Sequence, residues 1–144
     1  MAPGTDDALI TALIDEMSRA YRERDLTALM ACLARSADVT ALGTSIDEKC
    51  IGRDAVEAQF VRDWEQYDEA SFVRGWTSVT VRGDVAWAVS DMALAFRAGD
   101  ASGEMAGRST IIAVREDDSW RVAHWHLSAP APQDEGESST ADAR

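Results

Sequence analysis

Apolar and polar residues alternate along the second half of the chain, and this alternation is the feature that most restricts the possible folds. A period of two is typical of β-strands, whose side chains face the two sides of a sheet in turn. It predicts four long strands, over residues 71–82, 85–96, 105–115 and 119–128. The first two and the last two are joined by short turns, which favours antiparallel neighbours, and a longer polar loop is expected over residues 97–104. Because long strands twist and coil, the segment predicts a strongly curved, mainly antiparallel sheet.

The first half of the chain has the apolar spacing of helices. Apolar residues three and four positions apart predict an amphipathic helix over about residues 6–23. A shorter helix is expected after Asp25, which is a good N-cap, and a third over residues 54–68. Residues 38–42 predict a short strand and residues 43–52 a loop. This order predicts an α+β domain with three N-terminal helices packed on one face of the sheet.

A length of 144 residues fits a single domain of ordinary size. We expect this domain to occupy residues 1–130. Residues 131–144 contain four acidic residues and no large apolar residue, a composition typical of a disordered acidic tail.

The charge of the chain excludes several classes of partner. It has 26 acidic residues against 14 lysines and arginines, which gives a net charge of −12. Such a charge opposes binding to nucleic acid and to anionic membranes. We expect a cytoplasmic protein, since no apolar run is long enough for a membrane span and the first residues lack the pattern of a signal peptide. Cys32 and Cys50 lie in different predicted elements and are expected to be reduced, packed thiols.

The last predicted strand contains the pattern W-x-x-x-H-x-H-x-S, formed by Trp120, His124, His126 and Ser128, with a proline two residues later. This pattern resembles the closing strand of the nuclear-transport-factor-2-like superfamily, especially its SnoaL-like domains. It is also similar to the association domain of calcium/calmodulin-dependent protein kinase II. The resemblance spans about residues 6–130 and implies a cone-shaped α+β barrel with a cavity. Because this superfamily includes isomerases, cyclases, dehydratases, transport adaptors and oligomerisation hubs, the fold does not choose the function.

Three residues are candidates for proton transfer in such a cavity: Asp91, His124 and His126. Unbroken alternation places both histidines on the same face of the last strand as Trp120, and we expect that face to line the cavity. Asp91 is a lone acid among apolar residues and requires either a partner or a raised pKa. Arg108 on the next predicted strand is its natural partner. The alternatives are a structural ion pair and histidines that only hydrogen-bond to neighbouring groups.

The spacing of residues along the predicted helices and strands suggests the side chains that line the cavity and those that form an interface. Five residues are expected to contact a small organic ligand: Tyr21, Trp64, Trp87, Arg108 and Trp120. Trp125 and Leu127 fall on the opposite face of the last strand and are expected to be buried in a two-fold homodimer.

Three functions follow as hypotheses. The first is a small-molecule-binding SnoaL-like domain with an apolar, tryptophan-lined cavity and no assigned reaction. The second is a cofactor-independent isomerase, cyclase or dehydratase that uses Asp91 or His126 for proton transfer. The third is an oligomerisation hub. Neither a cofactor nor a metal is expected, since the sequence has no glycine-rich phosphate loop and no HExxH pattern.

Overall fold

The computed structural model describes residues 5–36 and 38–131. The helices are α1 (Asp6–Glu23), α2 (Leu26–Ala31) and α3 (Arg53–Gln66). The strands are β1 (Thr40–Leu42), β2 (Lys49–Ile51), β3 (Glu69–Arg82), β4 (Val85–Ala98), β5 (Ala101–Glu116) and β6 (Ser119–Ser128). The predicted acidic tail, apart from Ala131, lies outside the described residues.

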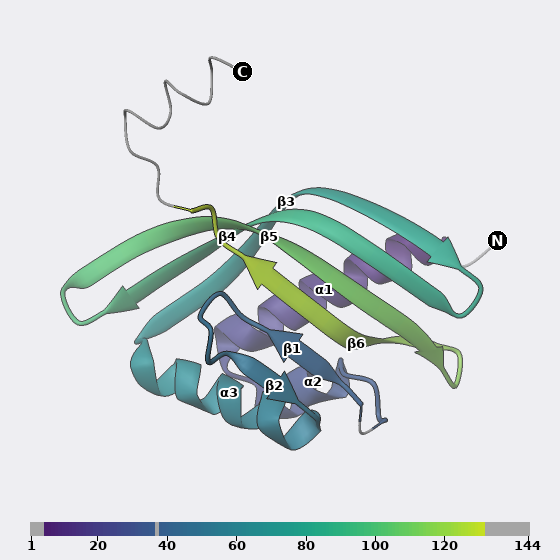
Figure 1. Ribbon diagram of the computed structural model, residues 1–144, viewed down its shortest axis with the longest axis horizontal. Helices are drawn as coiled ribbons and strands as arrows, with labels where there is room; N and C mark the ends of the chain where they lie inside the picture. The colour runs from purple at the N-terminus through teal and green to yellow at the C-terminus, as the bar shows by residue number, and fades with distance from the viewer. Residues whose placement is uncertain (1–4, 37, 132–144) are drawn as a thin grey trace, which may run out of the picture.

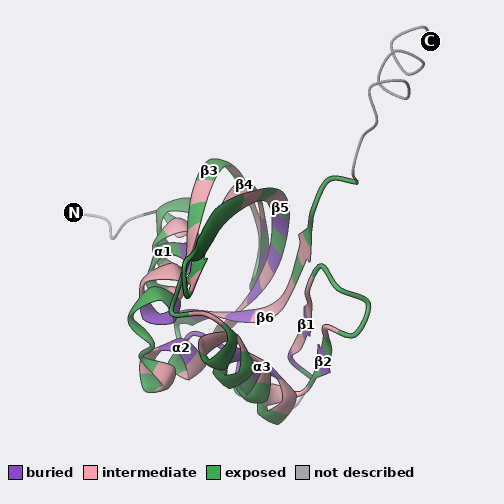
Figure 2. Cartoon of the chain, turned by 90° about the vertical axis from the view of Figure 1, so that its left-hand side faces the viewer, coloured by how far each residue is buried: buried purple, intermediate pink, exposed green. Residues whose placement is uncertain are grey.

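The six strands of the described residues form one sheet in the order β2-β1-β6-β5-β4-β3 (Figure 1). β1 runs parallel to β6, and the other neighbouring strands are antiparallel. The sheet is strongly curved, but within the described residues its edge strands β2 and β3 do not pair, so the barrel is not closed (Figure 2). The predicted α+β fold with a curved, mainly antiparallel sheet is confirmed.

The hydrophobic core lies between the helices and the inner face of this sheet. α1 packs against β3, and α3 packs against β2 and β1. Ile10 and Ile14 of α1 and Val56 and Phe60 of α3 are buried in this core, as the helical spacing predicts. No helix among the described residues is both long and apolar enough to cross a membrane.

Two predicted loops contain additional strand. β2 lies inside residues 43–52 and pairs with β1. The predicted loop over residues 97–104 is instead the extension of β4 and β5 into a tight hairpin, in which Gly99 adopts a positive φ of 62°. Backbone pairing satisfies the amide groups whatever the polarity of the side chains, so a polar sequence does not exclude a strand at a solvent-exposed end. Glycine takes the left-handed conformation that the tight turn requires without steric cost.

Trp120 connects the start of α1 to the hairpin formed by β5 and β6 through contacts with Asp6 and Arg115. Its indole Nε1 donates a hydrogen bond to Asp6 Oδ1 at 3.2 Å, and the Arg115 guanidinium lies 4.4 Å from the centroid of its ring. Arg115 Nη2 also donates to Asp6 Oδ2 at 3.2 Å, and these hydrogen bonds hold the pKa of Asp6 below its ordinary value. Trp120 is therefore a structural residue.

A β-bulge interrupts the alternation of β6. Val122 is paired with Ala113, while His124 is paired with Ile112, so the intervening Ala123 has no partner on β5. A bulge of this kind places two residues opposite one and resets which side chains point to each face of the sheet.

The reset changes the composition of the inner face. Before the bulge the even-numbered Trp120 and Val122 are buried, whereas after it the odd-numbered Trp125 and Leu127 face inward. The bulge thus allows β6 to contribute large apolar side chains to the inner face along its whole length.

Candidate functional site

A cavity of about 750 Å³ lies between the inner face of the sheet and the helices α1 and α3. Strands β4, β5 and β6 form one wall, and the connection between β1 and β2, residues 43–48, contributes to another. This volume is within the range of pockets that enclose small organic ligands. The sequence predicts such a cavity, but most of the side chains that line it are not the predicted ones.

Aromatic rings from several elements line the cavity. Phe60 of α3 stacks on Trp125 of β6, with ring centroids 5.8 Å apart and planes inclined by 6°. Tyr21 of α1 lies against Phe72 of β3 with centroids 4.9 Å apart. Further apolar lining comes from Met17, Met92, Leu94, Phe96 and Met105. Such a lining of aromatic and flexible thioether side chains suits a flat, apolar ligand.

Polar side chains of α1 and α3 that line this cavity are joined by hydrogen bonds. Tyr21 Oη donates a hydrogen bond to Asp63 Oδ2 at 3.0 Å, and Gln59 Nε2 donates to Asp63 Oδ1 at 2.8 Å. The Arg62 guanidinium donates in turn to Gln59 Oε1 at 2.8 Å. We call these four residues the α3 polar cluster. Each oxygen of the Asp63 carboxylate accepts one hydrogen bond, so the carboxylate is held in a fixed orientation.

Burial determines the acidity of this cluster. It raises the pKa of Asp63, because the charged carboxylate loses hydration, and the negative charge of Glu48 acts in the same direction. The hydrogen bonds from Gln59 and Tyr21 lower that pKa but do not cancel the effect of burial. Burial and the neighbouring Asp63 also raise the pKa of Tyr21, so its phenol stays protonated and donates. A half-buried acid with a raised pKa is a feature of functional sites.

Asp91 and Arg108 lie on the outer face of the sheet, away from the cavity. They are paired across β4 and β5, with Asp91 Oδ1 and Arg108 Nε 3.9 Å apart and side chains 60% and 80% exposed. An exposed pair of this kind is weak. The alternation predicted for β4 is correct, but the inward face is the one that carries Ala86, Ala88 and Ser90. Both faces of β4 are apolar, so the sequence alone does not decide which one turns inward.

His124 and His126 also lie on the outer face, and here the cause is the bulge. The prediction assumed unbroken alternation from Trp120 onward, whereas the extra residue Ala123 reverses the faces that follow it. His124 Nδ1 lies 2.7 Å from the Oγ1 atom of Thr40 on β1, and His126 is exposed. The expectation that both histidines face the cavity is corrected, and His124 makes the contact with a neighbouring hydroxyl that was the alternative.

Tyr21 is the one predicted ligand contact that lines the cavity. Trp64 lies behind it and donates from Nε1 to the backbone oxygen of Tyr21 at 3.1 Å. Trp87 lies on the outer face and is 39% exposed. Arg108 lies on the same face and is more exposed. Trp120 is buried at the start of α1. These four side chains are absent from the cavity wall as the described residues define it.

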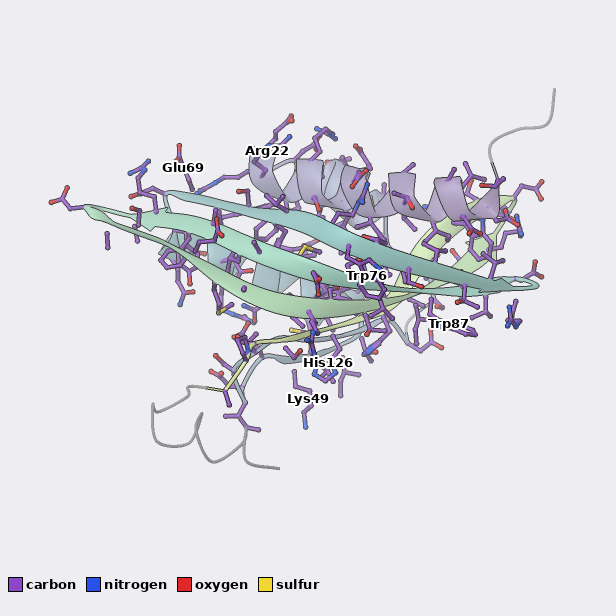
Figure 3. The ribbon with its side chains drawn as sticks, turned by 90° about the horizontal axis from the view of Figure 1, so that it is seen from above. Arg22, Lys49, Glu69, Trp76, Trp87 and His126 are labelled. Carbon is purple, nitrogen blue, oxygen red and sulfur yellow. The ribbon has the colours of Figure 1, made fainter. Side chains whose placement is uncertain are left out.

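The two residues expected at a dimer interface lie on the inner face of the sheet instead. Trp125 and Leu127 line the cavity and therefore cannot form the outer face of the sheet. The large apolar side chains that are exposed on β3 and β4 are Val73, Trp76, Val85 and Trp87. In Figure 3, α1 runs along the top of the view, Trp76 is drawn over the long strands, and Trp87 and His126 lie further from the helix.

Asp63 and Gln59 were not predicted, although the sequence holds a signal for them. Val56, Phe60 and Asp63 follow the spacing i, i+4, i+7, so the acid occupies an apolar position of the third helix. Gln59 lies one turn before Asp63 on the same side. An acid in an apolar stripe is a candidate for a functional role, since burying it without partners is costly.

Both cysteines lie among the described residues. Cys32 and Cys50 are free and buried, as predicted, and burial raises the pKa of both thiols. In residues 5–36 and 38–131 no three histidine, cysteine or acidic side chains are arranged to hold a metal ion.

The model of the SnoaL-like domain family matches residues 10–132, and the chain belongs to this family. Among solved structures, it is similar to an NTF2-like protein of unknown function from Pseudomonas putida KT2440. That protein is 24% identical, with a TM-score of 0.76 over 92% of this chain and 93% of the other.

Two further structures carry functional names. A provisionally assigned dehydratase of the NTF2-like family from Streptomyces avermitilis is 16% identical, with a TM-score of 0.81 over 90% of this chain and 100% of the other. A provisionally assigned calcium/calmodulin-dependent protein kinase II association domain from Xanthomonas campestris is 18% identical, with a TM-score of 0.78 over 91% of both chains. At these identities the likeness concerns the fold alone. No curated protein matches the sequence.

Substitutions can test whether Trp125 faces the cavity and His126 faces outward. We expect Trp125→Ala to lower the free energy of unfolding by about 3 kcal/mol, because it removes a large side chain stacked on Phe60 in the inner wall. His126→Ala is the matched control and should cost less than about 0.5 kcal/mol, because its side chain is exposed. Urea denaturation measures both, and a larger loss for the histidine variant would contradict the assigned faces.

Proposed function

We propose that this SnoaL-like domain binds a small, largely apolar organic molecule in the cavity between the sheet and helices α1 and α3. The observation that carries the proposal is a cavity of about 750 Å³ lined by stacked aromatic rings and one oriented polar cluster. Pockets for small molecules combine these features: an apolar wall supplies affinity, and a few fixed polar groups set orientation.

A matched pair of substitutions on β5 tests this proposal. Ser109 is buried and lines the cavity, while its neighbour Thr110 is exposed on the other face. We expect the wild-type protein to bind the neutral fluorescent probe N-phenylnaphthylamine. Ser109→Phe should weaken this binding by about tenfold or more, because the ring occupies space in the cavity that the probe needs. Thr110→Phe should leave it unchanged.

Thermal unfolding identifies which variants are folded. If Ser109→Phe does not fold, Ser109→Leu replaces it as a smaller substitution at the same position. The proposal fails if the wild-type protein does not bind the probe, or if both phenylalanine variants bind it as the wild type does.

A second candidate function is proton transfer in the same cavity, as in a cofactor-independent isomerase, cyclase or dehydratase. Asp91 and His126, the residues that the sequence suggests for this role, lie on the outer face. A reaction in the cavity would therefore use Asp63, whose neutral and charged forms are closer in free energy than those of an exposed acid. Tyr21 and Gln59 would position its carboxylate.

The acidity of Asp63 can be measured directly. We expect NMR of its side-chain carboxyl carbon to give a pKa above that of an unfolded aspartate, with Asp63→Asn identifying the resonance. A raised folded pKa means that the native state holds this proton more tightly, so stability is lost as pH rises from the unfolded pKa through the folded one. Tyr21→Phe should raise the pKa further, because it removes a hydrogen bond that favours the charged form. A folded pKa at or below the unfolded value would exclude this candidate.

A third candidate, the oligomerisation hub, is supported by the apolar outer face. We call Val73, Trp76, Val85 and Trp87 the outer apolar patch; Trp76 is 62% exposed, and Arg82 lies 5.8 Å from the ring of Trp87. Although the chain is strongly acidic, two arginines lie beside these apolar residues: Arg82 next to Trp87, and Arg108 paired with Asp91. A second copy placed by a two-fold axis would bury the patch on both chains.

The dimer can be tested with substitutions on two different surfaces. We expect the wild-type protein to sediment as a dimer, and the double variant Trp76→Ser, Trp87→Ser to raise the dissociation constant by about a hundredfold, because it removes two large apolar contacts. Val61→Ser on α3 is the control, since Val61 is also an exposed apolar residue but lies outside the patch. A monomeric mass of the wild-type protein at all concentrations would overturn the dimer.

A further inference from the structure

The hydroxyl donor of Tyr21 and one N–H of the Gln59 amide are used inside the α3 polar cluster. Tyr21 Oη and Gln59 Nε2 both donate to Asp63, and Arg62 donates to Gln59. A carboxylate has about four acceptor positions, of which Asp63 uses two for these contacts. The Asp63 carboxylate therefore has free acceptor positions, and a ligand group that binds to this carboxylate must be a hydrogen-bond donor.

The charges that line the cavity are predominantly negative. Asp47, Glu48 and Asp63 contribute carboxylates, whereas Arg62 is the one lysine or arginine in the wall formed by the described residues. The Arg62 guanidinium is engaged with Gln59 at the outside of the cluster and is itself exposed. An anionic ligand would thus face three carboxylates, while a cation would be attracted.

Aromatic rings lie close to the Asp63 carboxylate, to which such a cation would bind. The Tyr21 ring lies 4.9 Å from Phe72 and 6.2 Å from Phe60, centroid to centroid, and its hydroxyl contacts the Asp63 carboxylate. Aromatic faces attract cations, and the interaction strengthens where water is excluded. A buried cation also needs a charged partner, because an unpaired charge is costly inside a protein.

From the oriented carboxylate, the charge of the wall and the aromatic rings, we propose that the ligand of this cavity is a lipophilic amine, bound as its ammonium form. The ammonium group donates hydrogen bonds to the free acceptor positions of Asp63 and lies beside the rings of Tyr21 and Phe72. The apolar part of the ligand extends between Phe60, Trp125 and the methionines of the wall. This inference rests on the proposed binding function and adds the chemical class of the ligand.

Three probes of nearly equal size test the chemical class with the wild-type, full-length protein. They are naphthylmethylammonium, naphthylmethanol and naphthoate, each with its substituent on the same ring carbon, and calorimetry at neutral pH measures their affinities. We expect the ammonium probe to bind about tenfold more tightly than the alcohol, and the alcohol more tightly than the carboxylate. This ranking requires no variant. Equal affinities of the ammonium and alcohol probes would overturn the amine assignment and leave the binding function intact.

Two substitutions that each remove one negative charge from α3 test the role of Asp63. Asp63→Asn should abolish the preference for the ammonium over the alcohol, whereas Glu65→Gln, at an exposed position outside the cavity wall, should keep it. If both variants lose the preference equally, the attraction comes from the overall charge, and recognition by Asp63 is refuted. If the wild-type protein binds none of the three probes, both the amine assignment and the binding function fail.

Discussion

The extra residue at Ala123 in β6 is the constraint on which the site depends. It leaves β6 paired with β5 on both sides but reverses the direction of the side chains beyond it. Trp125 can therefore stack on Phe60 in the cavity wall, while His124 turns to the outer face and contacts Thr40. Without that residue the wall would carry imidazoles in place of an indole and an apolar side chain, and the cavity would have a different chemistry.

The α3 polar cluster shows how a charged group is kept inside such a cavity. Burial opposes the charge of Asp63, and two hydrogen bonds from Tyr21 and Gln59 offset part of this cost. The remaining cost makes the carboxylate receptive either to a proton or to a cationic ligand. The two proposed roles of Asp63, proton transfer and amine recognition, both depend on this remaining cost of burying the charge. A bound proton would remove the charge, whereas a bound ammonium group would neutralise it.

The family assignment fixes the architecture and leaves the chemistry open. Structures with the same fold carry names as different as dehydratase and kinase association domain, at identities below 20%. The functions proposed for this chain use separate faces of one sheet. The inner face, with α1 and α3, encloses the cavity, whereas the outer apolar patch offers a surface for a second copy.

Local patterns in the sequence were sufficient for α1 and β6, whose predicted bounds agree with the structure, and for the order of helices and long strands. They were sufficient because helical and strand periodicity, and caps such as Asp25, involve residues close together along the chain. The sequence could not decide which face of β4 turns inward, since both are apolar, nor reveal that Ala123 interrupts β6. The contact between Tyr21 and Asp63, 42 residues apart, was likewise decided by the tertiary structure, which brings the end of α1 to α3. The direction in which a strand face points and the contacts between distant residues depend on how separate elements pack. Local sequence patterns do not contain this information.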